Sequence, residues 1–574
     1  MRQSTSSRNS IVATFITAAN DEYADVVKIC TSSVARPDDT NTFDTITDLI
    51  ESALYNNITK IYIHDFNYVS HYIYNWCLTN NLTTSEHPVK DKLTWSTLRD
   101  ETGHVYFINI YCGFDGCTHE LCIRSSRNKL MNSTKKLASS YLNIDVDIAD
   151  QTIQLNSSDE LNDKHIRTCT ISSVIIASVL QQQLNTGYTS LTISTDGFKS
   201  WQKLDLGNEG IYQLTEEEDT DLRYAYRGGF TWCNPRFSGI KIKHGLVLDI
   251  NSLYPFVMYK YPMPWGRPQV ITEIPDSGYF VGHFYVTATL KPDGIPCISN
   301  MTSTDASAGS IIKNEYLTDI QYLDCWLTNF DLALLEQNYF VHDLQFISGY
   351  SFKTRDNLFK NYIEHWYDIK QNSQGAQRQT AKLFLDALYG RFGLKHYKHV
   401  TKPVLDNNKL VYKKQDVKSD TSTRYLPLSL FITSIARYII INQAHQVGLD
   451  KLIYVDTDSL HIVGTDIPSF INISNDLGCY KIEAIFTEAK YLGLKTYIHT
   501  EVKNFNNLDT NIVIKDDDEL VVRTTMSGAS DTIQNQVTWD NFKCGTVLTG
   551  KTKISIVPGG CYRTNTKYTI VQCF

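Results

Sequence analysis

Three aspartates in this sequence have the type and spacing needed to hold divalent cations. Asp456 and Asp458 lie one residue apart in the apolar stretch KLIYVDTDSLHIV, whose alternation predicts two strands joined by a tight turn. Asp249 ends a second apolar, strand-like run just before an expected helix. Carboxylates this close repel one another unless a cation lies between them, and hard oxygen ligands suit Mg2+. Alone, an Asp-rich turn is as readily a solvated loop. Three carboxylates at strand ends could hold two metal ions for an in-line phosphoryl displacement.

A basic segment lies between these acidic sites in the chain. The stretch KQNSQGAQRQTAKLFLDALYGRFG (residues 370–393) predicts a helix from Ala376 onward, because apolar residues recur at core spacing. Arg378 and Lys382 lie four residues apart and share one face of that helix, so both could reach a triphosphate. Tyr389 offers a ring that could pack against a nucleotide. A basic amphipathic helix is usually only a surface helix, and its place between the two acidic motifs is what favours nucleotide binding.

The order of these segments resembles motifs A, B and C of the family B DNA polymerases. DINSLYP is similar to motif A, the basic helix to motif B, and YVDTDS to motif C. The likeness is close to one subgroup, the protein-primed polymerases of small Bacillus-type phages and linear replicons. RYAYRGGFTW (223–232) resembles its YxGG motif, EAKYLGLKTYI (488–498) contains its KxY motif, and VPGG (557–560) fits its C-terminal region. The likeness is dense from about residue 223 to 497 and thinner elsewhere.

The resemblance implies a role for each candidate residue. Asp249, Asp458 and the backbone of Ile250 would bind two Mg2+ ions, for which Mn2+ can substitute, and Asp456 would be a supporting or transient catalytic ligand. The residues implied to bind the incoming dNTP are Tyr254 and Tyr389 at the sugar, Arg378 and Lys382 at the phosphates, and Lys370 from the turn before the helix. Those implied to contact DNA are Tyr226, Arg227, Gly228 and Gly229 for the template and Lys495 and Tyr497 for the primer.

The implied reaction is template-directed DNA synthesis, in which a primer 3′-hydroxyl attacks the α-phosphate of a dNTP. The implied partners are template and primer DNA, dNTPs and a terminal protein whose hydroxyl starts synthesis, with strand displacement by a monomeric enzyme of a virus, phage or linear replicon. A reverse transcriptase or RNA polymerase would also use paired aspartates, but the YxDTDS spacing and the YxGG motif argue against one. A non-catalytic DNA-binding remnant is the other alternative, and the survival of all three carboxylates argues against it.

The resemblance also implies a multidomain fold of α/β and α+β units: a right-hand polymerase with palm, fingers and thumb, an N-terminal RNase H-like exonuclease-type domain and two subgroup insertions. The expected ranges are 1–189 for the exonuclease-like domain, 190–260 and 424–528 for the palm, 261–357 for the first terminal-protein-region insertion, 358–393 for the fingers, 394–423 for the second insertion and 529–574 for the thumb. The second insertion alternates β-branched residues with lysines around Asn407 and Asn408, which predicts a hairpin.

Composition is compatible with this interpretation. The 574 residues are 42% hydrophobic, enough for several compact units. A net charge of −8 argues mildly against nucleic-acid binding, although a basic channel can coexist with acidic outer faces. The 13 cysteines include no CxxC, which favours reduced thiols, and a soluble protein of the host cytoplasm with no membrane segment is expected. Cys112, Cys117, His119 and Cys122 cluster loosely, but not at a standard zinc spacing.

The N-terminal segment departs from the family at every expected exonuclease ligand. Such sites need about four carboxylates for two metal ions. The opening strand ATFIT places Thr14 and Ile16 at the acidic positions, IYIHDFNYVSHYIYNWC places Val69 at the next, and TCTISSVIIASVL places Thr168 and Ser172 at the last two. Asp65 is displaced by four residues and is expected to face elsewhere, whereas His64 and Tyr68 are expected where single-stranded DNA would bind. The domain is predicted to be inactive; the alternative is exonuclease activity through unrecognised residues.

Motif B departs as well. The Asn-Ser usual before x-Y-G is replaced by Asp386-Ala387, which adds a negative charge near an incoming triphosphate. Asp386 could pair with a base edge, pair with Arg391, or point away from the nucleotide. At an effective dielectric near 20, the repulsion is of order 1 kcal/mol or more over a few Å. The substitution bears on nucleotide contact rather than on the reaction.

Overall fold

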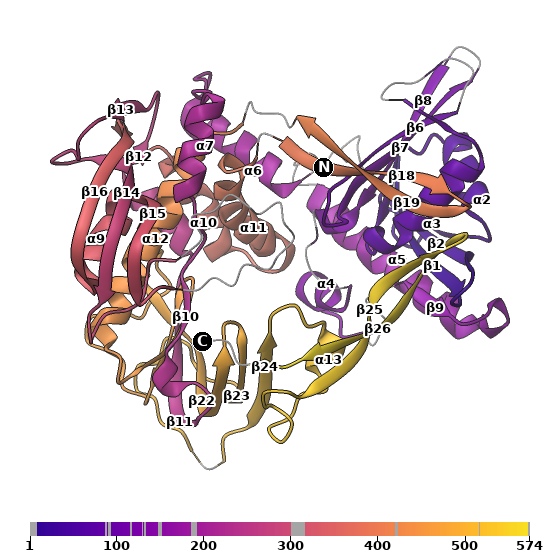
Figure 1. The fold of residues 1–574 in the computed structure, drawn as a ribbon. Helices are drawn as coiled ribbons and strands as arrows, with labels where there is room; N and C mark the ends of the chain where they lie inside the picture. Colours follow the sequence, from indigo (N-terminus) through magenta and orange to yellow (C-terminus); the bar gives the residue numbers. More distant parts are fainter. Residues whose placement is uncertain are drawn as a thin grey trace.

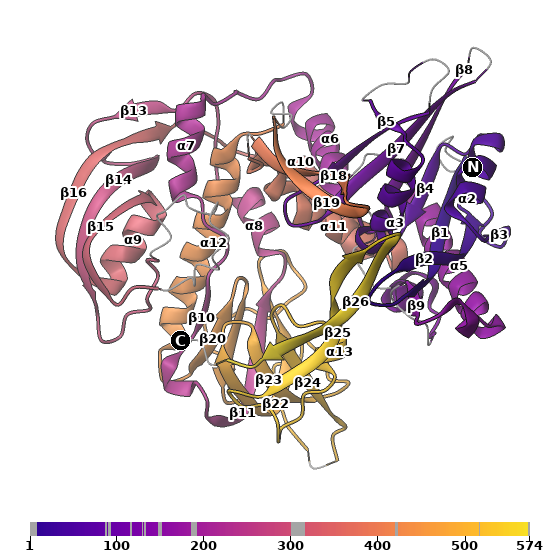
Figure 2. The same cartoon turned by 45° about the vertical axis from the view of Figure 1, so that its right-hand side comes forward.

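The computed structural model describes residues 9–85, 89, 93–114, 117–128, 130, 134–146, 152–184, 192–299, 316–395, 397–418, 423–515 and 517–571. Within these residues the strands form one nine-stranded, one seven-stranded and one four-stranded sheet, with three two-stranded pairs between them. Figures 1 and 2 show the nine-stranded sheet on one side of the molecule and the other two sheets opposite it. The boundary expected near residue 189 falls in 185–191, outside the described residues.

The N-terminal sheet has the strand order β3-β2-β1-β4-β8-β7-β6-β5, with β9 also paired to β1. Strand β1 is buried on both faces, as a central strand covered by helices should be. The strands are β1 Ser10–Ala19, β2 Ala24–Ser33, β3 Thr40–Phe43, β4 Lys60–Ile63, β5 Thr83–Thr84, β6 Thr94–Arg99, β7 Val105–Phe114, β8 Cys117–Ser125 and β9 Ile153–Leu155. The helices are α2 Ile46–Tyr55, α3 Phe66–Thr79, α4 Thr134–Leu137 and α5 Asp163–Leu184.

The seven-stranded central sheet carries the acidic motifs. Its order is β10-β20-β21-β11-β22-β23-β24. The two strands from residues 231–250 are therefore interleaved with the five strands from residues 452–526. The strands are β10 Thr231–Cys233, β11 Lys241–Ile250, β20 Leu452–Asp456, β21 Ser459–Val463, β22 Tyr480–Gly493, β23 Thr496–Val502 and β24 Leu520–Met526. Helices α8, Leu253–Lys260, and α12, Leu426–Val447, pack against one another, and α12 also contacts β20 and β21.

The first predicted insertion contains a four-stranded antiparallel sheet of order β13-β16-β14-β15. Its strands are β13 Gln269–Ile271, β14 Tyr279–Leu290, β15 Asp319–Thr328 and β16 Tyr339–Phe352, and helix α9 is Asn329–Asn338. A short pair, β12 Met263–Pro264 with β17 Thr354–Arg355, closes the segment, while 300–315 lies outside the described residues. The predicted fingers are the helices α10, Lys360–Asn372, and α11, Gly375–Phe392. Both pack against α6, Ile193–Trp201, and α7, Glu216–Ala225, follows before the central sheet begins.

The hairpin predicted in the second insertion is present. Strands β18, Tyr397–Asp406, and β19, Lys409–Lys418, pair around Asn407 and Asn408, which both adopt positive φ as a tight hairpin turn requires. The hairpin lies across the N-terminal sheet (Figure 1), and an antiparallel bridge joins Asp100 to Val400. Tyr412 of β19 bonds to His71 of α3, and the guanidinium of Arg99 lies 3.8 Å from the Tyr412 ring centroid.

A second hairpin, β25 Val547–Val557 with β26 Gly560–Thr569, follows the short helix α13, Asp531–Gln534, and reaches the same N-terminal domain. Its turn is the VPGG sequence. A Cβ on Gly559 would lie 2.2 Å from the Ala24 carbonyl, and one on Gly560 would lie 2.2 Å from the Tyr72 ring, so no larger residue fits this close approach. Because Leu410, Val557 and Cys561 are buried in the N-terminal core, both hairpins share that core.

The described residues contain one helix long and apolar enough to cross a membrane, α12. Its most apolar 18-residue stretch is 78% buried inside the fold, which is typical of a core helix.

The second hairpin is fixed to the N-terminal domain by Arg563, which forms an ion pair with Asp65, donates to the Thr152 carbonyl and stacks over the Tyr68 ring at 3.9 Å. We expect Arg563→Ala to lower the local opening free energy of β26 by about 2 kcal/mol, because the partly buried carboxylate of Asp65 loses its partner. Hydrogen exchange of the β26 amides should then accelerate by roughly thirtyfold. The matched control is Lys503→Ala, which removes an ion pair to Glu519 that is exposed on both sides and should change little. Unchanged exchange in Arg563→Ala would contradict this role.

Candidate active site

Asp249 of motif A and Asp458 of motif C lie at the adjacent ends of neighbouring strands. Strands β11 and β21 pair antiparallel with Asp249 opposite Ser459, and the Ile250 N–H donates to the Asp458 carbonyl at 2.8 Å. The β20–β21 turn holds Thr457 at φ 62°, an unusual conformation for a β-branched residue. The Thr457 N–H donates to the Phe230 carbonyl at 2.7 Å, which stabilises that turn. The fold thus fixes both carboxylates at one sheet end.

The electrostatics of this pair favour a bound cation. Asp249, Ile250 and Asp458 line a cleft of about 580 Å3. Burial, together with the charges of Asp249 and Glu483, raises the pKa of Asp458 to about 7. Two carboxylates and a backbone carbonyl are oxygen donors of the kind that Mg2+ prefers, so these residues fit a divalent ion.

Asp456 is held apart from that pair. Its carboxylate accepts hydrogen bonds from the Lys495 ammonium at 2.8 and 3.0 Å and from Thr231 at 3.3 Å, and it does not line the cleft. Lys495, the first residue of the KxY motif, therefore contacts motif C directly. Tyr497, the last, packs in an aromatic cluster with Tyr454 and His499, at ring-centroid distances of 5.5 and 4.8 Å.

Opposite the carboxylates, helices α10 and α11 supply a basic wall. Arg378 and Lys382 both line the cleft from α11, as their spacing predicts, and Lys370 lines it from the last turn of α10 rather than from a turn before the helix, because α10 extends to Asn372. Burial lowers the pKa of Lys370 to about 8, although Asp386 opposes this shift. The Lys370 ammonium donates to Ser252 at 2.8 Å, which ties α10 to the start of α8.

Asp386 also lines the cleft, so of the three alternatives left open for it, pointing away is the one that the structure disfavours. The reason is its position one helical turn after Lys382, on the face that α11 turns toward the carboxylates. Burial raises the pKa of Asp386, while the ammonium groups of Lys382 and Lys370 oppose the shift. The acid that replaces the family's asparagine thus lies among cations.

Two tyrosines close one end of the cleft. The rings of Tyr254 on α8 and Tyr389 on α11 lie 4.5 Å apart between centroids, tilted by 56°. A Cβ on Gly229 would lie 2.6 Å from the Thr457 side chain and 2.9 Å from the Tyr254 hydroxyl. This glycine therefore lets the YxGG segment approach motifs A and C closely. By contrast, a Cβ on Gly228 would meet nothing within 4 Å.

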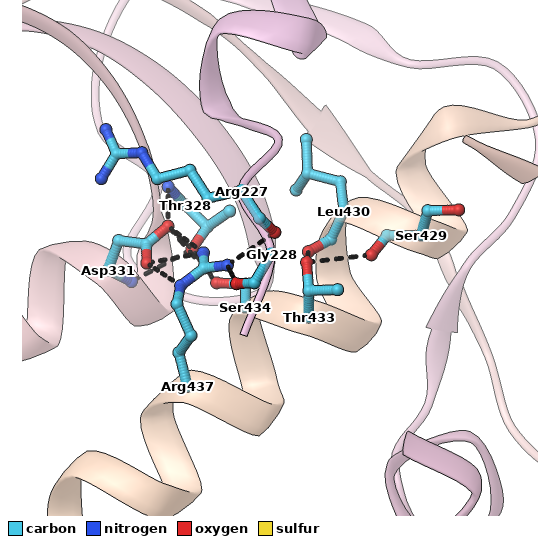
Figure 3. A network of polar contacts seen from close by, with 9 residues as sticks. All are labelled: Arg227, Gly228, Thr328, Asp331, Ser429, Leu430, Thr433, Ser434 and Arg437. Atoms are coloured by element: carbon cyan, nitrogen blue, oxygen red, sulfur yellow. Dashed lines mark hydrogen bonds and ion pairs between the residues drawn. The ribbon is translucent and has the colours of Figure 1, made fainter. Parts of the chain in front are cut away.

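The YxGG segment is positioned by a buried ion pair, drawn in Figure 3. Arg437 of α12 bonds Asp331 of α9 at 2.9 to 3.3 Å and donates to the carbonyls of Arg227 and Gly228 at 3.0 Å each. Arg437 and Asp331 side chains are each only 6% exposed. Burial opposes ionisation of Asp331, but Arg437 and Arg227 lower its pKa below the usual value. Tyr226, the first residue of the YxGG motif, lies against Gly393 just beyond α11.

The N-terminal domain contains a second, smaller cavity, of about 30 Å3, lined by Thr14, Thr168 and Ser172. Ile16 and Val69 are fully buried and do not line it. Asp65 does line it, contrary to the expectation that it faces elsewhere, because it lies at the junction of β4 and α3. Of the lining residues that the structure describes, Asp65 is the one carboxylate, and Arg563 and the Thr152 N–H already bind it.

His64 and Tyr68 also differ from expectation. The His64 ring is buried and bonds to Ser126 at 2.8 Å, and the Tyr68 hydroxyl is buried against the Cys561 carbonyl at 3.1 Å. Neither side chain is open enough to hold single-stranded DNA, because Tyr68 is 1% exposed against the β25–β26 hairpin and His64 is 4% exposed where it lines the small cavity.

The cysteine-rich segment spans strands β7 and β8, where Cys112 pairs with His119 and Asn109 with Cys122. The side chains of Cys112 and Cys117 lie outside the described residues. Among side chains that the structure describes, no group of three or more His, Cys, Asp or Glu is placed to hold a metal ion.

Sequence reasoning missed three residues of the site. Lys481 on β22 bonds directly to Asp249, and the Asp331–Arg437 pair holds the YxGG segment. Asp331 has a local signal, since Thr328 and Asp331 form a capping box at the start of α9. Lys481 and Arg437 have no such signal, because each acts on a residue more than 200 positions away in the chain.

Comparison with known proteins places this geometry in a family. The model of "DNA polymerase type B, organellar and viral" matches residues 118–477. The chain belongs to this family. The DNA polymerase of Bacillus phage PZA is 32% identical over 527 residues, covering 89% of this chain and 90% of that protein. The DNA polymerase of Bacillus phage phi29 is likewise 32% identical, with the same coverage.

Solved structures of the family agree. Phi29 DNA polymerase complexed with primer-template DNA superposes with a TM-score of 0.86 at 29% identity, covering 98% of this chain and 100% of that one. The same polymerase with primer-template DNA and incoming nucleotide substrates gives a TM-score of 0.85 at 30% identity and the same coverage. The fold expected from the motifs, a right-hand family B polymerase with an exonuclease-type domain, is therefore confirmed.

Proposed function

We propose that this protein is a template-directed DNA polymerase that transfers nucleotides from dNTPs to a primer 3′-hydroxyl. The observation that carries the proposal is the cleft, in which Asp249 and Asp458 lie across from the basic faces of α10 and α11. A reverse transcriptase or RNA polymerase is disfavoured because the relatives that span 89% of the chain are named DNA polymerases.

Each side of the cleft has a part in this reaction. Asp249, Asp458 and the Ile250 carbonyl would hold two Mg2+ ions, which when bound would activate the primer hydroxyl and offset charge on the triphosphate. Lys370, Arg378 and Lys382 attract and orient the triphosphate. Tyr254 and Tyr389 bracket the sugar. Asp456 acts through Lys495, whose contact aligns the primer-facing KxY segment with motif C.

Asp458→Ala tests the catalytic centre. Extension of a primed template should fall by at least about a thousandfold, or about 4 kcal/mol of transition-state stabilisation, because the paired carboxylate is lost. DNA binding, measured by fluorescence anisotropy, should remain. The matched control is Asp450→Ala, which removes an exposed aspartate paired with Arg236 and should leave extension unchanged. Extension by Asp458→Ala within tenfold of wild type would show that this residue holds no essential ion.

Tyr254→Val tests sugar selection. The Tyr254 ring, packed on Tyr389, would lie under C2′ of the sugar and leave no room for a 2′-hydroxyl. Incorporation of ribonucleotides relative to deoxynucleotides should rise by at least tenfold, about 1.4 kcal/mol. Tyr259→Val on the same helix, which loses a bond to Glu364 and some core packing but lies outside the cleft lining, is the control. A constant incorporation ratio in single-turnover measurements would assign the ring a packing role instead.

We further propose that a terminal protein primes synthesis and that the four-stranded sheet contacts it. The resemblance to protein-primed polymerases supports the partner. The surface is supported by exposed apolar side chains of that sheet, including Tyr322 at 61% and Phe340 at 53% exposure. The expected ranges then assign this sheet to the first insertion and the β18–β19 hairpin to the second, which would guide DNA during strand displacement.

The double change Tyr322→Ser and Phe340→Ser tests this surface. Attachment of the first nucleotide to the terminal protein of the same replicon should fall by about tenfold or more, because the apolar contact is lost. Extension of an ordinary DNA primer is the internal control and should persist. Equal loss in both assays, or in neither, would contradict a priming surface here.

The N-terminal domain is predicted to have no 3′→5′ exonuclease activity. Thr14, Ile16, Val69 and Ser172 stand where carboxylates are needed, and Arg563 already neutralises Asp65. A labelled single strand incubated with Mg2+ or Mn2+ and no dNTPs should keep its length. Asp458→Ala serves as the comparison, because it removes the polymerase centre alone. Stepwise shortening by Asp458→Ala would reveal a second metal site and refute the prediction.

A further inference from the structure

One cation already occupies the candidate metal site. Lys481 lies on β22 directly opposite Asp249 in the antiparallel register with β11, and its ammonium group forms an ion pair with an Asp249 carboxylate oxygen. The Lys481 side chain is 31% exposed and Asp249 is 15% exposed, so the pair lies at the cleft wall rather than on the open surface. Both residues line the same cleft as Asp458.

The charges around this pair explain why the lysine belongs there. Three acidic residues from the central-sheet region, Asp249, Asp458 and Glu483, line the cleft. A fourth, Asp386, lines it from the facing helix α11. Without a positive group between the strand ends, Asp249 and Asp458 would repel each other. The Lys481 ammonium lies close enough to Asp458 to oppose the rise of its pKa.

The same contact sets up a competition. Lys481 contacts the carboxylate that would coordinate Mg2+, and the positive charge of its ammonium group repels a divalent cation that approaches the same carboxylate. Glu483 lies two residues beyond Lys481, at the bulge of β22 between the partners of Leu248 and Val247, and it lines the same cleft, so it offers the ammonium group a second carboxylate. Lys481 can therefore leave Asp249 without losing ionic compensation.

We propose that Lys481 is a positioning residue that holds Asp249 in the metal-free enzyme and is displaced toward Glu483 when a divalent cation binds. This inference rests on the proposed function. It makes Lys481 an internal competitor that lowers the affinity of the cleft for divalent ions and so sets the metal concentration at which the enzyme becomes active. The lysine holds the carboxylates in place before substrate binds. The consequence is weaker metal binding.

The test measures Mn2+ binding to the full-length, DNA-free protein by electron paramagnetic resonance. Lys481→Met should tighten binding by about tenfold, because a like charge is removed from the site. Lys481→Arg, which keeps the charge, should bind as wild type does. The matched control is Lys241→Met, which removes another lysine–carboxylate pair, Lys241 with Glu488, between the same two strands but away from the cleft.

A second readout is the Mg2+ concentration for half-maximal primer extension, which should fall in Lys481→Met. Lys481→Gln is measured in parallel, so that a folding defect in one variant does not decide the outcome. Unchanged or weaker Mn2+ binding in a folded Lys481→Met or Lys481→Gln protein would overturn the competition. Asp458→Ala separates the two levels of inference: retained Mn2+ binding there would refute the metal site itself, whereas its loss together with unchanged binding in the Lys481 variants would refute only the role of Lys481.

Discussion

The repulsion between Asp249 and Asp458 is the constraint on which the rest of the active site depends. The pairing of β11 with β21 brings the two carboxylates to one sheet end, where burial and then the charge of Asp249 raise the pKa of Asp458 to about 7. Positive charge therefore has to arrive from outside the pair. Lys481 supplies it from the neighbouring strand β22, and α10 and α11 supply it across the cleft. The divalent ions proposed for this cleft would supply the same compensation.

A second constraint fixes the geometry around that cleft. Arg437 and Asp331 are buried together, and burying two charges is favourable only where their remaining hydrogen bonds are satisfied. Arg437 meets this condition by donating to the carbonyls of residues 227 and 228, and Asp331 by capping α9. The central helix α12, the helix α9 of the four-stranded-sheet segment and the YxGG segment are thereby joined at one point (Figure 3). Gly229 is the next residue and lies against Thr457 and Tyr254. The buried ion pair therefore also fixes how the YxGG segment packs against motifs A and C.

The parts of the site that sequence predicted are those with local patterns. Strand alternation around Asp456, the four-residue spacing of Arg378 and Lys382 and the paired asparagines of the hairpin all describe a few consecutive residues. Residues that depend on register between distant segments were not predictable in this way. Asp65 and Arg563 are 498 positions apart, and Lys481 faces Asp249 only because β22 pairs with β11 in one register. The misplaced orientation of Asp65, and the orientation of Asp386 that the sequence left open, have the same origin, since a side chain's direction follows from packing rather than from its neighbours in the chain.

The N-terminal domain, predicted to be inactive, is tied into the fold by other contacts. Among the described residues that line its cavity, Asp65 is the one carboxylate, and it is paired with the guanidinium of Arg563. The ion pair does what a bound cation would do for the charge of Asp65, but it also connects the C-terminal hairpin to the domain. Both hairpins place apolar residues in this domain's core, so removing the domain would expose Leu410, Val557 and Cys561. The cost of exposing that core gives a physical reason for the domain to persist without metal ligands, because the hairpins require it as their anchor.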